Sequence, residues 1–209
     1  MKKMILGFHV ILIFFAYSGY LAFSLQNTSE LNSFQDSRGL YGFKNVRGEI
    51  VIPAKFKYAY KFNKYGIAAV QTDNNWQYIN TRGRVLLQPF IFDNGPDYFQ
   101  EGLARCVNKN NKVGFFTERG IIVIKPKYDF ATPFSEGFSS VCIGCKNVPV
   151  FRGSEYHVVR GGKWGIIDKT GKILVKLDYD HAERFNNGVA ELKKGSVKYF
   201  VDRTGRIYR

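Results

Sequence analysis

The chain contains few of the residues that most often carry chemistry. Its 209 residues include three histidines and three cysteines, and no glycine-rich phosphate loop or nucleophile elbow is present. His9 lies in an apolar N-terminal segment, and His157 and His181 lack the ligand spacing of a zinc site. Acidic residues are also scarce, 17 against 31 lysines and arginines. These absences predict that the protein is not an enzyme and holds no cofactor.

A repeated cassette is the clearest positive feature. Its best copy runs from Trp164-Gly165 to Gly171, and it recurs along the chain with the same closing glycine. Successive closing glycines are separated by 35, 37, 51 and 34 residues, a period typical of stacked supersecondary units. The five closing glycines are Gly48, Gly83, Gly120, Gly171 and Gly205.

Each cassette predicts an antiparallel hairpin. Asp168 can cap a type I turn and Gly171 can take the positive φ that closes it, so strands are expected at residues 164–167 and 172–175. A later apolar segment, such as residues 188–192, would add a third strand. The short polar side chains at the position of Asp168 in the other copies are Asn45, Asn80, Thr117 and Asp202.

These residues resemble the WG-repeat family, whose pattern is Trp-Gly-Tyr-Ile-Asp-Lys-Thr-Gly, then an apolar run with Pro-Lys-Tyr-Asp, then Phe-Ser-Glu-Gly. The match is closest at residues 164–180 and 124–137, whereas Gln77 replaces the glycine and Tyr41 the tryptophan in the first two copies. The resemblance implies an all-β repeat fold and no defined reaction. About four and a half three-stranded meanders are therefore expected over residues 40–209, closed like a propeller or open like a solenoid.

The N-terminus predicts export. Lys2 and Lys3 precede an apolar segment at residues 4–23, and Ala22-Phe23-Ser24 offers small residues for cleavage, so residues 1–24 are a signal peptide or a retained membrane anchor. Residues 25–39 are expected to be a polar linker. In both cases the repeats would lie outside the cytoplasm, in the periplasm, at the cell surface or secreted.

The repeats are basic. Removing residues 1–24 takes away Lys2 and Lys3 and no acid, so the net charge falls only from +14 to +12. Such charge often serves solubility alone, but a cation next to every closing glycine predicts a basic row, called here the turn rim. An acidic protein, an acidic glycan or an anionic lipid surface would be its partner, and nucleic acid is disfavoured. The turn rim comprises Arg47, Arg82, Arg119, Lys169 and Arg203.

The cysteines leave several interpretations open. Cys142 and Cys145 have the spacing of a redox or half-zinc motif, but also of a structural disulfide or of two buried thiols. Cys106 lies at nearly the phase of Cys142 one repeat earlier, so a bridge between units is a further alternative. The protein is thus expected to be an exported or anchored binding or scaffolding module, with a thiol-redox or metal-binding factor as the rival.

One unit is longer than the others. About 15 extra residues lie between Cys142 and Gly162, where an extended hairpin is expected with strands near residues 139–143 and 156–160. Insertions in repeat arrays often gather at binding faces, so the segment is also a candidate contact surface.

Overall fold

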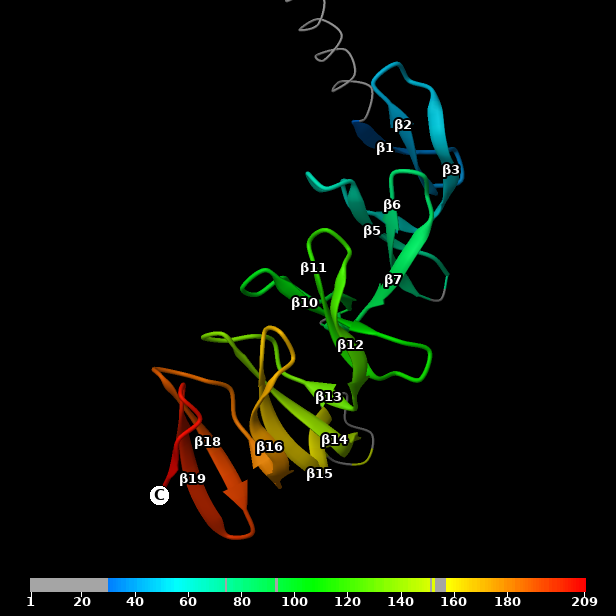
Figure 1. The fold of residues 1–209 in the computed structure, drawn as a ribbon. Helices are drawn as coiled ribbons and strands as arrows, with labels where there is room; N and C mark the ends of the chain where they lie inside the picture. The colour runs from blue at the N-terminus through cyan, green and yellow to red at the C-terminus, as the bar shows by residue number, and fades with distance from the viewer. Residues whose placement is uncertain (1–29, 74, 93, 151, 153–156) are drawn as a thin grey trace, which may run out of the picture.

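The computed structural model describes residues 30–209 except 74, 93, 151 and 153–156, and this part contains β-strands and no helix (Figure 1). The predicted all-β fold is confirmed. The strands, in chain order, are β1 Leu31–Gln35, β2 Tyr41–Asn45, β3 Ile50–Phe56, β4 Tyr58–Ala59, β5 Ile67–Gln71, β6 Trp76–Asn80, β7 Val85–Pro89, β8 Ile91–Phe92, β9 Gly95–Pro96, β10 Leu103–Val107, β11 Val113–Thr117, β12 Ile122–Tyr128, β13 Phe130–Ala131, β14 Phe138–Pro149, β15 His157–Asp168, β16 Ile173–Tyr179, β17 His181–Ala182, β18 Val189–Lys194, β19 Val197–Asp202 and β20 Ile207–Tyr208.

The antiparallel meanders are present, but their phase differs from the prediction. The third strand of one unit pairs with the hairpin of the next, as β14 pairs with β15 in the order β13-β14-β15-β16 and β18 with β19 in the order β17-β18-β19-β20. The first sheet is β1-β2-β3, so the predicted linker is wrong for residues 31–39, which form β1 and its turn into β2. Residues 25–29 lie outside the described part.

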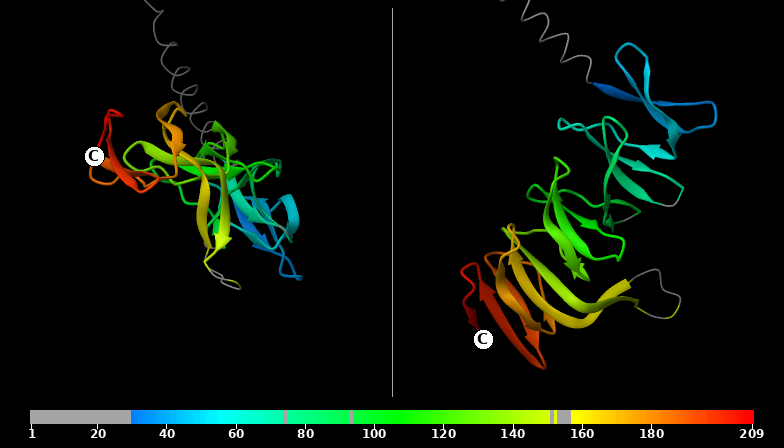
Figure 2. Two further views of the ribbon diagram at one scale, coloured as in Figure 1. Left: turned by 90° about the horizontal axis from the view of Figure 1, so that it is seen from below. Right: turned by 45° about the vertical axis from the view of Figure 1, so that its right-hand side comes forward.

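The sheets stack as an open array. Figures 1 and 2 show a twisted column with the described N-terminal strand and the C-terminus at opposite ends. The C-terminal strand β20 pairs with β19, and β1 pairs with β2, so the closed, propeller-like alternative is wrong. Each interface between sheets buries its own apolar cluster, because β5 and its counterparts alternate side chains to both faces.

The closing turns form as predicted. Gly171 has φ +85°, its N–H donates to the carbonyl of Asp168 at 2.9 Å, and the Asp168 carboxylate accepts from the N–H groups of Thr170 and Lys172. Asn45, Asn80 and Asp202 accept bonds in the same way. Thr117 is the exception: its buried hydroxyl has no hydrogen-bond partner among the described residues.

The glycine after the aromatic is required by a bulge in the second strand. A Cβ on Gly165 would lie 2.5 Å from the carbonyl oxygen of Val175, and one on Gly114 would lie 2.3 Å from that of Ile124. In the second unit, β6 and β7 lack the register shift found at this point in three other hairpins, β2–β3, β11–β12 and β15–β16. Gln77 is accommodated there for that reason.

The long unit is an extended hairpin, as predicted, with β14 and β15 of 12 residues each. Both strands are longer than expected from the sequence, and β15 runs without a break into the Trp164 cassette. The hairpin projects from the side of the array in Figure 2.

Candidate ligand-binding site

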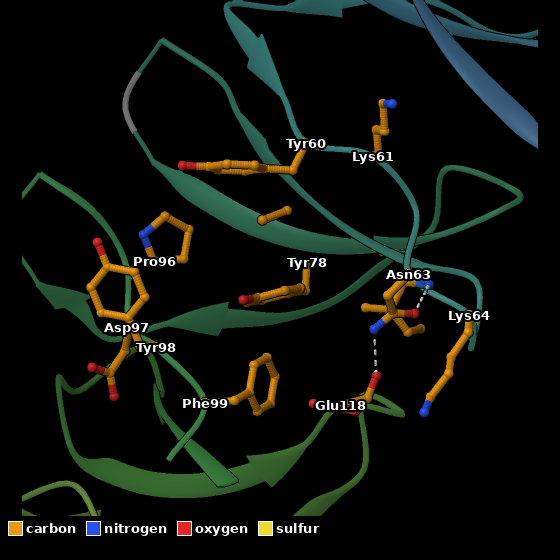
Figure 3. Close-up of a pocket in the computed structure, with 12 residues that line it drawn as sticks. Tyr60, Lys61, Asn63, Lys64, Tyr78, Pro96, Asp97, Tyr98, Phe99 and Glu118 are labelled. Carbon is orange, nitrogen blue, oxygen red and sulfur yellow. Dashed lines mark hydrogen bonds between the residues drawn. The ribbon is translucent and has the colours of Figure 1, made fainter. Parts of the chain in front are cut away.

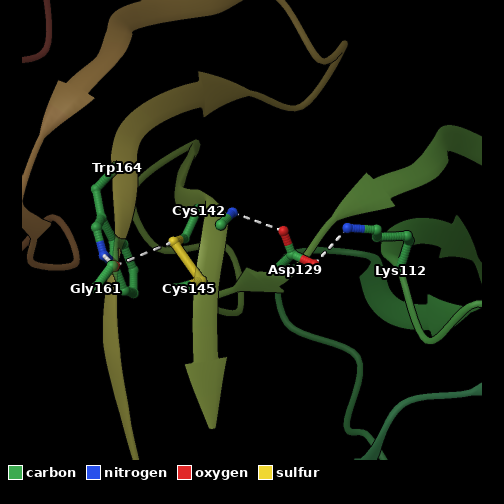
Figure 4. The surroundings of a disulfide bond; sticks show 7 residues. Lys112, Asp129, Cys142, Cys145, Gly161 and Trp164 are labelled. Carbon is green, nitrogen blue, oxygen red and sulfur yellow. Dashed lines mark hydrogen bonds and ion pairs between the residues drawn. A yellow bond between two sulfur atoms is a disulfide. The ribbon is translucent and has the colours of Figure 1, made fainter.

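The cysteine pair forms a disulfide within β14. Cys142 and Cys145 are bonded and both are buried (Figure 4), whereas Cys106 is a free buried thiol in an earlier layer of the array. The alternative bridge between Cys106 and Cys142 is therefore wrong, because the two side chains belong to different apolar clusters. Burial raises the pKa of the Cys106 thiol to about 12.

A repeated aspartate supports the backbone beside this disulfide. Asp129 lies between β12 and β13, where the chain passes from one sheet to the next; its carboxylate pairs with Lys112 and accepts the Gly144 N–H at 2.7 Å (Figure 4). The Lys112 ammonium, followed by the Gly144 bond, holds the pKa of Asp129 below its usual value. Asp180 repeats the arrangement with Lys163 and Gly195 in the next unit. These carboxylates cap turns and are not arranged as an acid-base pair.

The turn rim is partly occupied by the protein itself. The hairpin tips point the same way along the array (Figure 1). Three of their cations contact the residue that precedes Gly66, Gly102 or Gly137, two units earlier. Lys169 pairs with Glu101 at 3.0 Å and Arg203 with Glu136 at 2.7 Å. Arg119 lies over the ring of Tyr65, 4.7 Å from its centroid.

The other two rim cations, Arg47 and Arg82, are exposed, and their side chains make no ion pair or hydrogen bond with the described residues. The sequence therefore placed the five cations at turns, but three of them contact residues of the unit two positions earlier. The part left for a partner is smaller than the sequence suggested.

A hollow lies elsewhere, among the first three units. A cavity of about 600 Å³ opens between the connector before β5, strand β6 and the segment before β10 (Figure 3). Ile67, Ala69 and Phe99 give it an apolar floor, and Tyr60 and Tyr78 lie one above the other with their hydroxyls on the same side. A concave apolar site with a few polar groups is the usual form of a small-ligand pocket.

An inserted hairpin, β8–β9, forms one side of the cavity. At its base, the Asp97 carboxylate accepts from the Arg105 Nε and Nη2 at 2.8 Å each, and the two side chains are only 3% and 4% exposed. Arg105 also donates to the carbonyl of Ala131 at 2.9 Å and lies over the Phe90 ring. At the tip, the Trp76 indole donates to the carbonyl of Asn94 at 3.2 Å. The insertion is fixed at both ends.

Positive charge predominates among the side chains that line the cavity. Asp97 is already neutralised by Arg105, so the remaining charged lining residues are Lys61, Lys64 and Glu118. Burial, followed by the charge of Asp97, raises the pKa of Tyr78 to about 12. Its phenol therefore stays protonated and can donate a hydrogen bond into the cavity.

A row of aromatic rings continues outward from the cavity, with Tyr58 and Tyr60 exposed and Tyr41 and Trp76 half-buried. Tyr60 lies 5.6 Å from Trp76 and 5.1 Å from Tyr58, and Tyr58 lies 5.8 Å from Tyr41 (centroid distances). Tyr58 and Tyr60 are 44% and 48% exposed. In later units the residues at the position of Tyr60 are Thr132 and Glu183, as their shared backbone bonding shows. The row is therefore peculiar to the first units.

Sequence reasoning missed this cavity. The predicted site residues were sought at turns and cysteines, whereas the cavity depends on the short insertion of residues 91–97 and on Arg105, which stands where the other units have Ala69, Ser140 and Glu191. A comparison of the repeats at that position, and the run of tyrosines at residues 58–65, would have been the available signals.

The repeat pattern decides the family. The sequence profile of the WG containing repeat matches residues 41–76, 78–112, 114–146 and 164–197, which together cover more than half of the chain. The protein belongs to the WG-containing repeat family. This confirms the resemblance noted in the sequence. A comparison with curated proteins found no match.

The WG repeats determine the scaffold, and the cavity occupies an irregularity in it. The first two matched segments contain Tyr60, Tyr78 and the β8–β9 insertion. Among the described residues, no group of three His, Cys, Asp or Glu side chains is placed to hold a metal ion. The same part of the chain has no helix long and apolar enough to cross a membrane, and residues 1–24 lie outside it.

Proposed function

We propose that this WG-repeat protein is a binding module that acts outside the cytoplasm and holds a ligand in the cavity between its first three units. The single observation that carries the proposal is the cavity of about 600 Å³ walled by Tyr60, Tyr78 and a firmly anchored insertion. Lys2, Lys3 and the apolar segment at residues 4–23 support export.

The geometry favours binding over catalysis. The carboxylate nearest the cavity floor, Asp97, has its oxygens engaged by Arg105, and Tyr78 has a pKa raised to about 12. A phenol with this pKa is a poor proton-transfer group at physiological pH. The disulfide gives the redox alternative little support, because both of its sulfurs are buried.

An aromatic anion tests the site without assuming its natural ligand. Anilinonaphthalene sulfonate should bind full-length protein at one site, and Ala69→Leu should weaken binding at least tenfold by filling the cavity. The fold should tolerate this change, because Arg105 and Glu191 occupy the corresponding position in other units.

The control removes two exposed apolar side chains that do not line the cavity. Ile122 and Ile173 are 42% and 50% exposed at equivalent positions of two hairpins, and the probe could bind there instead. The double variant Ile122→Ser/Ile173→Ser should bind the probe as the wild type does. Loss of binding in this variant, with none in Ala69→Leu, would refute the cavity as the binding site.

A further inference from the structure

We infer that the ligand is an acidic oligosaccharide that lies along the aromatic row and inserts one sugar ring into the cavity. The inference rests on the proposed function and adds the chemical class of the ligand. It comes from three features that meet at Tyr60: the row, the cavity and the charge around its mouth.

The row and the cavity form one continuous surface. Tyr60 contacts Tyr58 and Trp76 on the outside and lines the cavity on the inside. A ligand that reaches the cavity along this surface therefore contacts several rings in succession. That geometry suits a chain of rings better than a single compact molecule.

The tilts of the rings favour sugars over stacked bases. Planes in the row are inclined by 52° between Tyr41 and Tyr58, by 70° between Tyr58 and Tyr60, and by 65° between Tyr58 and Trp76, with a smaller angle of 33° between Tyr60 and Trp76. Bases on a single-stranded nucleic acid bind by laying their faces on aromatic rings in succession. Pyranose rings present C–H groups on faces and edges and turn relative to each other along the chain, so inclined aromatic rings can each contact one.

The cavity offers the hydrogen-bonding groups that a sugar needs. The Tyr78 hydroxyl is held protonated by its surroundings, and the Tyr60 hydroxyl lies on the same side (Figure 3). Ile67 and Ala69 add apolar lining to the same cavity. An apolar face combined with a few polar groups matches the amphipathic character of a sugar ring.

The charge selects an acidic sugar. Lys61 and Lys64 line the mouth against the single carboxylate of Glu118, since Asp97 is neutralised by Arg105. An excess of one cation at the site, on a chain with formal net charge +14, attracts a carboxylated ligand. A uronic acid residue would supply that carboxylate.

The experiment compares three probes on full-length protein by isothermal titration calorimetry: tetragalacturonate, cellotetraose and octathymidylate. Tetragalacturonate should bind at least tenfold more tightly than cellotetraose and displace anilinonaphthalene sulfonate. Tyr60→Ala should weaken it about tenfold, the cost of about 1.4 kcal/mol for one stacking ring. Tyr208→Ala is the matched control, because this ring is 41% exposed but lies in the last strand. The Tyr208→Ala variant should bind tetragalacturonate as tightly as the wild type.

Charge is tested separately from stacking. Lys61→Gln/Lys64→Gln should remove the preference for tetragalacturonate over cellotetraose, whereas Lys125→Gln/Lys176→Gln, at exposed sites on β12 and β16, should preserve it. Octathymidylate binding as tightly as tetragalacturonate would overturn the inference in favour of nucleic acid. Anilinonaphthalene sulfonate bound in the cavity, with neither saccharide displacing it, would overturn the ligand class and leave the binding module standing. If Ala69→Leu bound anilinonaphthalene sulfonate as tightly as the wild type, both the cavity as the binding site and the ligand class would be overturned.

Discussion

The ion pair at the base of the β8–β9 insertion should be the most sensitive polar interaction of the array. Asp97 and Arg105 are 3% and 4% exposed, so neither charge is solvated once the other is removed. Truncating Arg105 to Met would leave the Asp97 carboxylate with only the Arg105 backbone N–H at 3.1 Å. Breaking a buried pair in this way costs about 3–5 kcal/mol.

The geometry of Arg105 places the expected cost near the middle of that range. The truncation also removes the donor to the Ala131 carbonyl at 2.9 Å and the cation over the Phe90 ring, 4.1 Å from its centroid. Both losses lie at the join between the second and third units, so we expect about 4 kcal/mol. Against a total stability of about 5–15 kcal/mol, the variant should be severely weakened.

The assay is equilibrium urea unfolding followed by tryptophan fluorescence, with hydrogen exchange to locate the loss in β8–β10. The matched control is the double variant Asp97→Leu/Arg105→Met, which removes both charges together and should recover most of the stability. It should also show whether the cavity needs the pair for binding. A change below about 1 kcal/mol in Arg105→Met alone would refute the reasoning, because it would mean that water reaches the carboxylate.

The remaining predictions concern the repeat, the thiol and one surface carboxylate. Gly165→Ala should destabilise the protein by more than about 2 kcal/mol, because the added Cβ would meet backbone at 2.5 Å, and calorimetric melting would measure this. Gly171→Val should cost more than about 1 kcal/mol, because a β-branched residue is strained at φ +85°; an unchanged melting temperature would show that the turn relaxes. Ellman titration should detect no thiol in native protein, one after unfolding, when Cys106 is exposed, and three after unfolding with reductant; a reactive thiol in the native state would contradict the burial. The Arg203 hydrogen bond lowers the pKa of Glu136 from 4.5, so its stabilisation is complete above that pH and lost as pH falls through the lower, folded value. Melting curves between pH 5 and 3 should lose part of this dependence in Glu136→Gln.

Local rules determined the parts of the fold that repeat. The turn at Asp168 and Gly171 follows from a short acceptor and a residue that tolerates positive φ, both readable three residues apart. The glycine that follows the aromatic residue, such as Gly165, recurs in the sequence, but the sequence does not show why it is required. Its reason is the bulge of the facing strand, which also explains why Gln77 is allowed where that bulge is missing.

Contacts between units could not be predicted from the sequence. The phase of the meander was misread because pairing β14 with β15 joins two units, and nothing local distinguishes that pairing from one within a unit. The cysteines allowed several pairings by spacing alone, and only the layers separating Cys106 from Cys142 decided between them. The turn rim was correctly placed at turns, whereas its ion pairs with Glu101 and Glu136 depend on how far each tip overlaps an earlier unit.

By itself, the sequence determined an all-β array of WG repeats, because alternation, turn chemistry and period are local and recur with every unit. The tertiary structure alone decided that the array stays open and that it contains a cavity. Both depend on distances between residues far apart in the chain, such as Tyr60, Tyr78 and Asp97. Small rotations between successive sheets set those distances, and no single repeat encodes them.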